Sequence, residues 1–196
     1  NVGGFMNSRH ITPSHLVLTR TQAGVGLIEV LVSLLLLAVA VLGYIGLQTR
    51  TVAATSDGLV KSNMITIMRD LADRIRYNPT AIAAYRTDLN TYSEDYKTSG
   101  AATAPEANCD AATCSAAQQA AFDTYEAATR SYSSGFSIRM EVCPGTTGNG
   151  VMETQCLLGA WGDTTATIGT TAATDCIDQT TGNYYRRAQC LIMEGQ

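Results

Sequence analysis

Histidine is almost missing from this sequence of 196 residues. Its two histidines, His10 and His15, both precede Gly24, so none follows that glycine. Histidine is the commonest general base for Ser and Cys nucleophiles and a standard zinc ligand, and without it only carboxylates, Lys or Tyr remain for such chemistry. This shortage argues against most classes of enzyme. We therefore expect a non-enzymatic protein with no metal ion or other cofactor.

Motifs for phosphate, redox chemistry and nucleic acid are missing as well. The Gly-rich stretch 145–150 lacks the lysine of a P-loop and is interpreted as a turn. No two cysteines have the C-x-x-C spacing of redox sites or of paired zinc knuckles. Without Arg9 and Arg20, which precede Gly24, eleven basic residues stand against seventeen acidic ones, a net charge of −6. Such a surface does not attract nucleic acid.

Charged residues are also missing between Glu29 and Arg50. The twenty residues Val30–Thr49 are rich in Leu, Val and Ala and would extend about 30 Å as a helix, enough to cross the hydrocarbon core of a bilayer. Arg9 and Arg20 precede this run with no acidic residue, which favours a cytoplasmic location for that end. The sequence predicts one membrane span, with everything after Arg50 exported.

Proline is missing from the stretch 25–78, so the span and the residues after it can form one continuous helix of about 80 Å. Pro79 disfavours helical geometry at Asn78 and is expected to end this helix. The second half is predicted to be amphipathic, with a stripe that packs on its own domain. Apolar residues recur there every three or four positions, at Val60, Met64, Met68, Leu71 and Ile75.

A glycine stands directly before the apolar run, whereas an ordinary secretory signal carries its small-residue cleavage site after such a run. The pattern Gly24, Val25, Leu27, Ile28, Glu29 resembles the class III leader of type IV prepilins. That resemblance implies cleavage by a prepilin peptidase between Gly24 and Val25 and methylation of the new Val25 amine. It also implies that Glu29 pairs with a neighbouring subunit's amino terminus, because a buried carboxylate and a buried amine become tolerable when paired. The alternative is a plain membrane anchor whose Glu29 reaches the lipid headgroups.

Six cysteines follow the predicted span, and an even number in an oxidising compartment indicates disulfides. Sequence alone does not choose among the fifteen possible pairings. Short local loops suggest Cys109 with Cys114, Cys143 with Cys156, and Cys176 with Cys190.

The exported part is predicted to combine one helix with a small sheet. Residues 80–113 lack a clear period and are expected to form an irregular loop, with at most a short helix near Ile82–Tyr85. Ser115 and Gln118 have the form of a capping box that begins a helix to about Arg130. This helix is expected to bury Ala121, Phe122 and Tyr125. Strands are predicted at 136–142, where apolar and polar residues alternate, at 152–161, where Trp161 is expected to be a core residue, and at 184–193.

The segment from Cys114 to Asp123 resembles one that recurs in PilV-type minor pilins, also called type IV pilus modification proteins, in which a strand and a cysteine follow. This resemblance implies an α+β pilin fold, in which a long N-terminal helix packs on a small antiparallel sheet with disulfide-closed loops. The expected segments are a cleaved leader (1–24), a transmembrane assembly half of the helix (25–50), its amphipathic periplasmic half (51–78) and a globular domain (79–196).

The resemblance further implies a minor pilin that helps to prime pilus assembly and is carried to the pilus tip at the cell surface. Its expected partners are other minor pilins, the major pilin, the prepilin peptidase and the inner membrane. Three alternatives stay open at this point, and one is a membrane-tethered enzyme, which only a carboxylate pair or a free thiol could serve. A type II secretion pseudopilin has the same leader, Glu29 and helix, and a tip adhesin would bind a surface ligand through the Thr, Ala and Tyr-rich loops.

Overall fold

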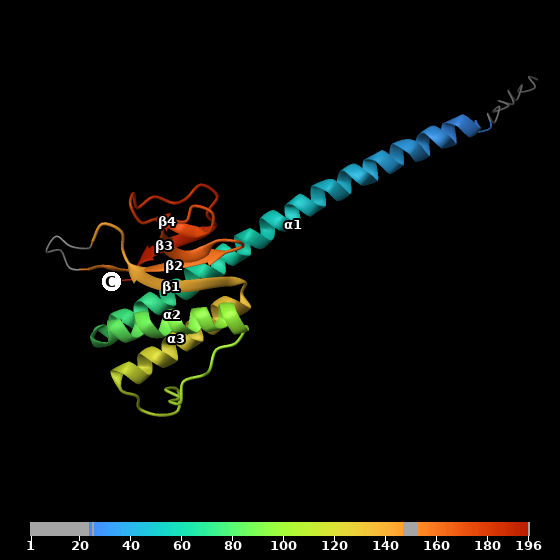
Figure 1. Cartoon of the computed structure of the whole chain (residues 1–196). Coiled ribbons are helices and arrows are strands. Elements are labelled where there is room, and N and C mark those ends of the chain that lie inside the picture. The colour runs from blue at the N-terminus through green and yellow to red at the C-terminus, as the bar shows by residue number, and fades with distance from the viewer. Residues whose placement is uncertain (1–23, 25, 147–152, 196) are drawn as a thin grey trace, which may run out of the picture. The chain divides into compact units, whose positions relative to one another are not determined.

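The computed structural model describes residue 24 and residues 26–146 and 153–195 (Figure 1). The chain divides into two compact units, residues 1–49 and residues 50–196. The predicted turn at 145–150 falls mostly outside the described residues.

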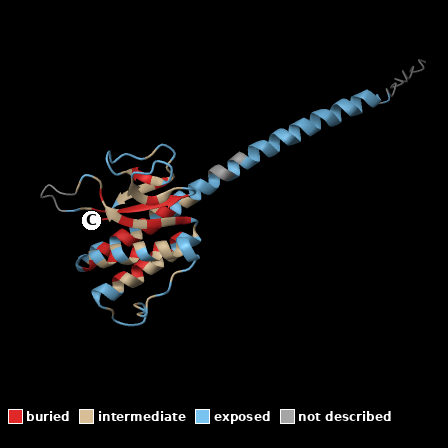
Figure 2. Cartoon of the chain, viewed as in Figure 1, coloured by how far each residue is buried: buried red, intermediate tan, exposed pale blue. Residues whose placement is uncertain are grey.

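Helix α1 runs from Leu27 to Tyr77. Its first part, Leu27–Thr49, is the one described helix long and apolar enough to cross a membrane. The side chains there are exposed in the single chain, including large ones such as Leu27 and Leu42, which are 78% and 70% exposed (Figure 2). Exposed leucines at this density require an apolar environment from lipid or from other protein chains.

The second half of α1 presents its predicted apolar stripe to the core of unit 50–196. Met64, Met68, Leu71 and Ile75 are all fully buried, whereas Val60 is half-buried at the edge of the stripe. The helix ends at Tyr77, as the proline at position 79 predicts.

A glycine lets α1 approach the sheet closely. A Cβ at Gly159 would lie 2.3 Å from Met64 Sδ and 2.9 Å from Met68 Sδ. Only a residue without a side chain therefore fits beneath these two methionines.

The expected loop after Pro79 is wrong, because this segment folds as a short 3-10 helix, η1 (Pro79–Ala81), followed by α2 (Ile82–Ser99). The buried side chains of α2 are Tyr85, Leu89 and Ser93, four residues apart on one face. Only one of the three is aliphatic, so the stripe gives a weak period in the sequence. Tertiary packing decides in favour of helix here.

Helix α3 (Ala116–Ser133) begins at the predicted capping box. The prediction of which residues this helix buries is wrong by one or two positions, since Ala121, Phe122 and Tyr125 are only partly buried. The residues that face inward are small or polar, which lets α2 and α3 lie side by side (Figure 1). They are Ala120, Asp123, Thr124, Ala127, Ala128 and Ser131.

The main sheet has three antiparallel strands in the order β1-β2-β5. Strand β1 (Phe136–Val142) alternates as predicted, and β2 (Gln155–Trp161) is buried along its whole length. The third strand, β5 (Cys190–Glu194), begins later than expected. Its predicted first half is a loop in which Arg187 adopts a left-handed backbone, φ 90°. Strands β3 (Thr165–Gly169) and β4 (Asp175–Asp178) form a separate parallel pair that the sequence did not predict.

Side chains cover the outer edge of β1. The amide of Asn90 donates from Nδ2 to Met140 O at 3.0 Å and accepts from Met140 N at 2.9 Å, so it mimics a neighbouring peptide group. Ser93 Oγ donates to Ile138 O on the same edge. At the opposite edge of the sheet, Ile192 N donates to Tyr184 Oη at 3.2 Å.

The fold class is the predicted one. A long N-terminal helix, two shorter helices and a small antiparallel sheet with three disulfides make an α+β protein.

Candidate functional site: an exposed apolar helix and a buried helix junction

Two of the sequence-predicted site residues that the structure describes, Gly24 and Glu29, lie just before and at the start of α1. Gly24 is exposed with no atom within 4 Å of an added Cβ, and Val25 lies outside the described residues. Glu29 lies in the first turn of α1, where its backbone N donates to Gly26 O at 2.9 Å. A carboxylate in the first turn is favourable because the helix dipole places partial positive charge there.

The carboxylate of Glu29 is exposed and makes no ion pair within the described part of the chain. It therefore remains available to a cation outside those residues. The hydroxyl of Ser33, one turn later, already has a partner within α1, because it donates to the backbone oxygen of Glu29 at 2.7 Å.

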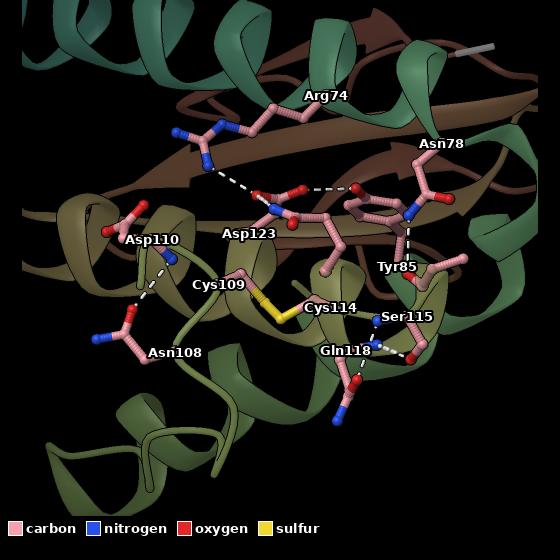
Figure 3. The surroundings of a disulfide bond; sticks show 12 residues. Arg74, Asn78, Tyr85, Asn108, Cys109, Asp110, Cys114, Ser115, Gln118 and Asp123 are labelled. Atoms are coloured by element: carbon pink, nitrogen blue, oxygen red, sulfur yellow. Dashed lines mark hydrogen bonds and ion pairs between the residues drawn. A yellow bond between two sulfur atoms is a disulfide. The ribbon is translucent and has the colours of Figure 1, made fainter. Parts of the chain in front are cut away.

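A buried carboxylate joins the three helices of unit 50–196 (Figure 3). Asp123 of α3 is only 3% exposed. Its Oδ1 accepts from Arg74 Nη1 of α1 at 2.7 Å and from Gln119 Nε2 at 2.9 Å, and its Oδ2 accepts from Tyr85 Oη of α2 at 2.6 Å. Three donors from three helices thus satisfy one buried charge, which removes most of the cost of burying it.

The same guanidinium serves further carboxylates. Arg74 Nη1 lies 3.0 Å from Glu126 Oε2 on α3, and Arg74 Nε lies 3.4 Å from Asp70 Oδ2 on its own helix. Arg130 Nη1 reaches Asp70 Oδ2 at 3.1 Å and extends this network to the last turn of α3. The charges between α1 and α3 are therefore shared in a network rather than in isolated pairs.

The junction shifts two pKa values. Burial alone would lower the pKa of Arg74, but the hydrogen bond to Asp123 and the nearby carboxylates of Asp70, Asp123 and Glu126 raise it above its ordinary value. Burial raises the pKa of the Tyr85 hydroxyl, and the hydrogen bond to Asp123 raises it further. Arg74 stays cationic and Tyr85 stays neutral, so this is a fixed structural contact and not a proton-transfer site.

Helix ends meet at the same junction. Asn78 Nδ2, just past the end of α1, donates to Ala116 O in the first turn of α3 at 2.8 Å. Ser115 Oγ accepts from Gln118 N at 3.3 Å, and Gln118 Oε1 accepts from Ser115 N at 2.9 Å, which completes the predicted capping box (Figure 3). The Cys109–Cys114 disulfide immediately precedes this cap and closes the loop that leads into it.

All six cysteines form disulfides, and the structure brings together the pairs that the short loops suggested. Cys143–Cys156 connects the residue after β1 to β2, and Cys176–Cys190 connects β4 to β5. Among the described residues, no group of three or more His, Cys, Asp or Glu side chains is placed to hold a metal ion.

Sequence reasoning did not identify the junction. The sequence did not single out Arg74, and it gave Asp123 only as the last residue of the Cys114 segment. A usable signal existed, because Gln119 and Asp123 stand four residues apart on a helix whose other inward residues are small. The partners Arg74 and Tyr85 lie far away in the chain, and no local pattern connects them to Asp123.

One comparison with known families gives a match. The family model described as Tt1218-like, Type IV pilin Tt1218, matches residues 46–125. This chain is similar to type IV pilins. The matched region includes the second half of α1, all of α2 and the first half of α3, and therefore contains Arg74, Tyr85 and Asp123. It does not extend to the segment 24–29. No curated protein and no solved structure matches the chain.

The match supports a structural subunit of a type IV pilus. The matching family is one of structural proteins. The apolar first part of α1 fits a membrane-anchored pilus subunit.

Proposed function

We propose that this chain is a minor pilin of the PilV type, which helps to prime assembly of a type IV pilus and is placed at or near the pilus tip. The observation that carries the proposal is the pattern Gly24–Glu29 at the start of an exposed apolar helix, in a chain whose residues 46–125 match a type IV pilin. The predicted partners are other minor pilins and the major pilin, with the prepilin peptidase acting on the precursor at the inner membrane.

The structure supports a role for the Cys114–Asp123 segment, on which the resemblance to PilV-type proteins rests. Cys114 closes a disulfide, Ser115 and Gln118 cap α3, and Asp123 joins α3 to α1 and α2. The segment therefore fastens the globular part to the periplasmic half of the long helix. A subunit pulled through its helix transmits force to its globular part at such a junction.

In the proposed assembly Glu29 pairs with the amino terminus of a neighbouring subunit. Its exposed carboxylate and its lack of an ion pair within the described residues support this pairing. A charge buried without its partner is costly. Two neighbouring apolar helices would therefore pack stably only where Glu29 of one lies beside the amino terminus of the other.

Mass spectrometry of the mature amino terminus, from membranes and from sheared surface fibres, tests the proposal. We expect a methylated Val25 in both fractions. In the fibre fraction this chain should make up only a small share of the total protein. A processed chain confined to membranes would favour the pseudopilin, and an uncleaved leader would favour a plain anchor. Either result would overturn the proposal. Deleting the chain should also lower the number of pili per cell, and its restoration should recover them.

Glu29→Leu tests the pairing directly. We expect normal membrane insertion and processing but a lower yield in sheared fibres, because the substituted helix lacks the anion that pairs with its neighbour. Ser33→Ala, one turn later, is the matched control, since its hydroxyl bonds only to its own helix. Equal fibre yields for both variants would contradict the proposed role of Glu29.

A further inference from the structure

A cavity of about 320 Å³ opens between α2, α3 and the ends of β1 and β2. Four aromatic residues line it. Tyr96 of α2 and Tyr132 of α3 are stacked, with ring centroids 4.8 Å apart and planes inclined by 22°. Phe136 of β1 and Trp161 of β2 are buried residues of the core that also reach this cavity. The cavity wall is therefore partly aromatic, a lining that suits a ring-shaped ligand.

Several hydrogen-bond donors at the cavity have no acceptor. Trp161 is only 9% exposed, and its indole Nε1 is buried without a hydrogen-bond partner among the described residues. The hydroxyls of Tyr132 and Ser137 make no hydrogen bond within the described residues. A buried indole N–H usually has a hydrogen-bond partner, and none of the described residues supplies one to Trp161.

Other polar groups that line the cavity are already in use. Ser93 Oγ donates to Ile138 O, Tyr96 Oη bonds Thr129 Oγ1 at 2.8 Å, and Thr164 Oγ1 accepts from Gln189 N at 2.9 Å. These bonds hold the walls in place, so the free donors are presented by a fixed frame.

The charge of the cavity is positive. Lys97, in the last turn of α2, is exposed and makes no ion pair within the described residues, and none of the described residues that line this cavity carries a carboxylate. A second hollow of about 310 Å³ shares Lys97 and Ser137 with the first. Glu94 in that hollow is paired with Arg139 at 3.3 Å, and exposed Asp163 also lines it. Lys97 is thus the unpaired cation that the two hollows share.

We propose that this cavity binds a hexuronate, a six-membered sugar ring that carries a carboxylate. The C–H face of the ring packs on Trp161 and the tyrosine pair, and the carboxylate pairs with Lys97. Oxygens of the sugar accept from the hydroxyls of Tyr132 and Ser137 at the cavity wall. Two hydroxyls without partners, each able to donate and to accept, favour a sugar over a simple aromatic acid, which has only its two carboxylate oxygens to offer. The cavity is large enough for one sugar unit, and the second hollow continues it for a longer chain of sugars.

The chain carries a reporter and a matched control for this proposal. Trp161 is its single tryptophan, so tryptophan emission reads the cavity alone. The chain has two lysines, Lys97 and Lys61. Lys61 Nζ lies 5.2 Å from the centroid of the Trp161 ring, yet Lys61 does not line the cavity.

The test is a fluorescence titration of the purified full chain in detergent with glucuronate, glucose and benzoate. We expect a saturable change in emission with glucuronate, and binding at least about tenfold weaker with glucose, which lacks the carboxylate, and with benzoate, which lacks the hydroxyls. Lys97→Gln should weaken glucuronate binding by about tenfold or more, and Tyr132→Phe by a smaller factor. Lys61→Gln, which removes the same charge beside the same indole, should change it less than about twofold.

No saturable change with glucuronate would overturn the proposal. Equal affinities for glucuronate and glucose would overturn it too, and so would equal effects of the two lysine variants. Binding of benzoate as tight as that of glucuronate would assign the cavity to aromatic carboxylates instead. The titration uses purified protein, so its outcome is independent of whether the chain enters a pilus.

Discussion

Asp123 shows how a single residue organises this protein. Its carboxylate is buried, and each of its oxygens accepts from a donor on another helix, Arg74 from α1 and Tyr85 from α2. Gln119 adds a third donor from within α3. A buried charge is tolerated when its hydrogen-bond partners compensate for the loss of water. If one partner is removed, the remaining buried polar groups keep their desolvation cost without that compensation.

We expect Asp123→Asn to lower the free energy of unfolding by about 3 kcal/mol, because the neutral amide leaves Arg74 without its closest anion and sets an N–H against one of the former donors. Denaturant unfolding of the full chain in detergent, followed by near-UV circular dichroism, measures this loss. Asp73→Asn is the control, since Asp73 pairs with Arg76 at 3.2 Å on an exposed helix face. That change should cost less than about 0.5 kcal/mol. Similar losses in both variants would contradict the role of the junction.

Tyr85 makes stability depend on alkaline pH. Its pKa in the folded state is raised, first by burial and then by the bond to Asp123, so folding favours the neutral phenol. This contribution is fully present below the unfolded pKa of about 10 and is lost as pH rises through the folded pKa. Stability should therefore fall above about pH 10, and Tyr85→Phe should fall less steeply because it lacks this group.

Unfolding free energies measured on both sides of pH 10 check this slope. Tyr77→Phe is the control, because Tyr77 is 91% exposed, and it should keep the slope of the unsubstituted chain. A Tyr85→Phe variant with an unchanged slope would show that Tyr85 does not titrate with unfolding.

The residues of the site differ in how far sequence predicts them. The leader pattern is local, so the sequence alone predicts roles for Gly24 and Glu29. Those roles are tested by analysing the processed protein and its variants from cells. Arg74, Tyr85 and Asp123 come into contact only when the three helices pack together. Their positions along the chain have no regular spacing that would predict the contact.

At the scale of elements, strong local signals predicted the structure well. The long helix, its end before Pro79, the capping box of α3 and the alternation of β1 follow from the sequence. Helix α2 was missed because its inward face carries Tyr85, Leu89 and Ser93 and not an aliphatic stripe. Strands β3 and β4 were missed because they are short and pair in parallel, which gives neither a hairpin turn nor a clear alternation.

The cap of α3 gives a test at this scale. Ser115→Ala should lower the free energy of unfolding by about 1 kcal/mol, because it removes the acceptor for Gln118 N at a helix start that the junction depends on. Ser133→Ala is the matched control at the other end of the same helix, where the exposed hydroxyl donates to Arg130 O at 2.9 Å. Thermal unfolding of both variants measures the difference, and a larger loss for Ser133→Ala would contradict the capping assignment.

At the scale of the whole molecule, one disulfide joins the two sheets. Cys176 and Cys190 are 0% and 6% exposed and fasten the parallel pair to the antiparallel sheet. Cys109 and Cys114 are more exposed and close a loop of only five residues' separation.

We expect the double variant Cys176→Ser with Cys190→Ser to lose about 3 kcal/mol from its longer loop, and more from two buried hydroxyls. Cys109→Ser with Cys114→Ser should lose about 2 kcal/mol, because its loop is shorter. Unfolding temperatures of the two double variants rank them, and the reverse order would show that the exposed loop matters more than the joined sheets.

The covered edge of β1 has a consequence for crowding. In the proposed role the chain packs beside other subunits, where bare strand edges would pair one sheet with the next and aggregate. Here Asn90 and Ser93 occupy the bonding groups of Met140 and Ile138, and Tyr184 occupies that of Ile192 at the other edge. Neighbouring subunits in the proposed complex would thus recognise the chain through side chains, and the chain could leave its neighbours with its own sheet intact.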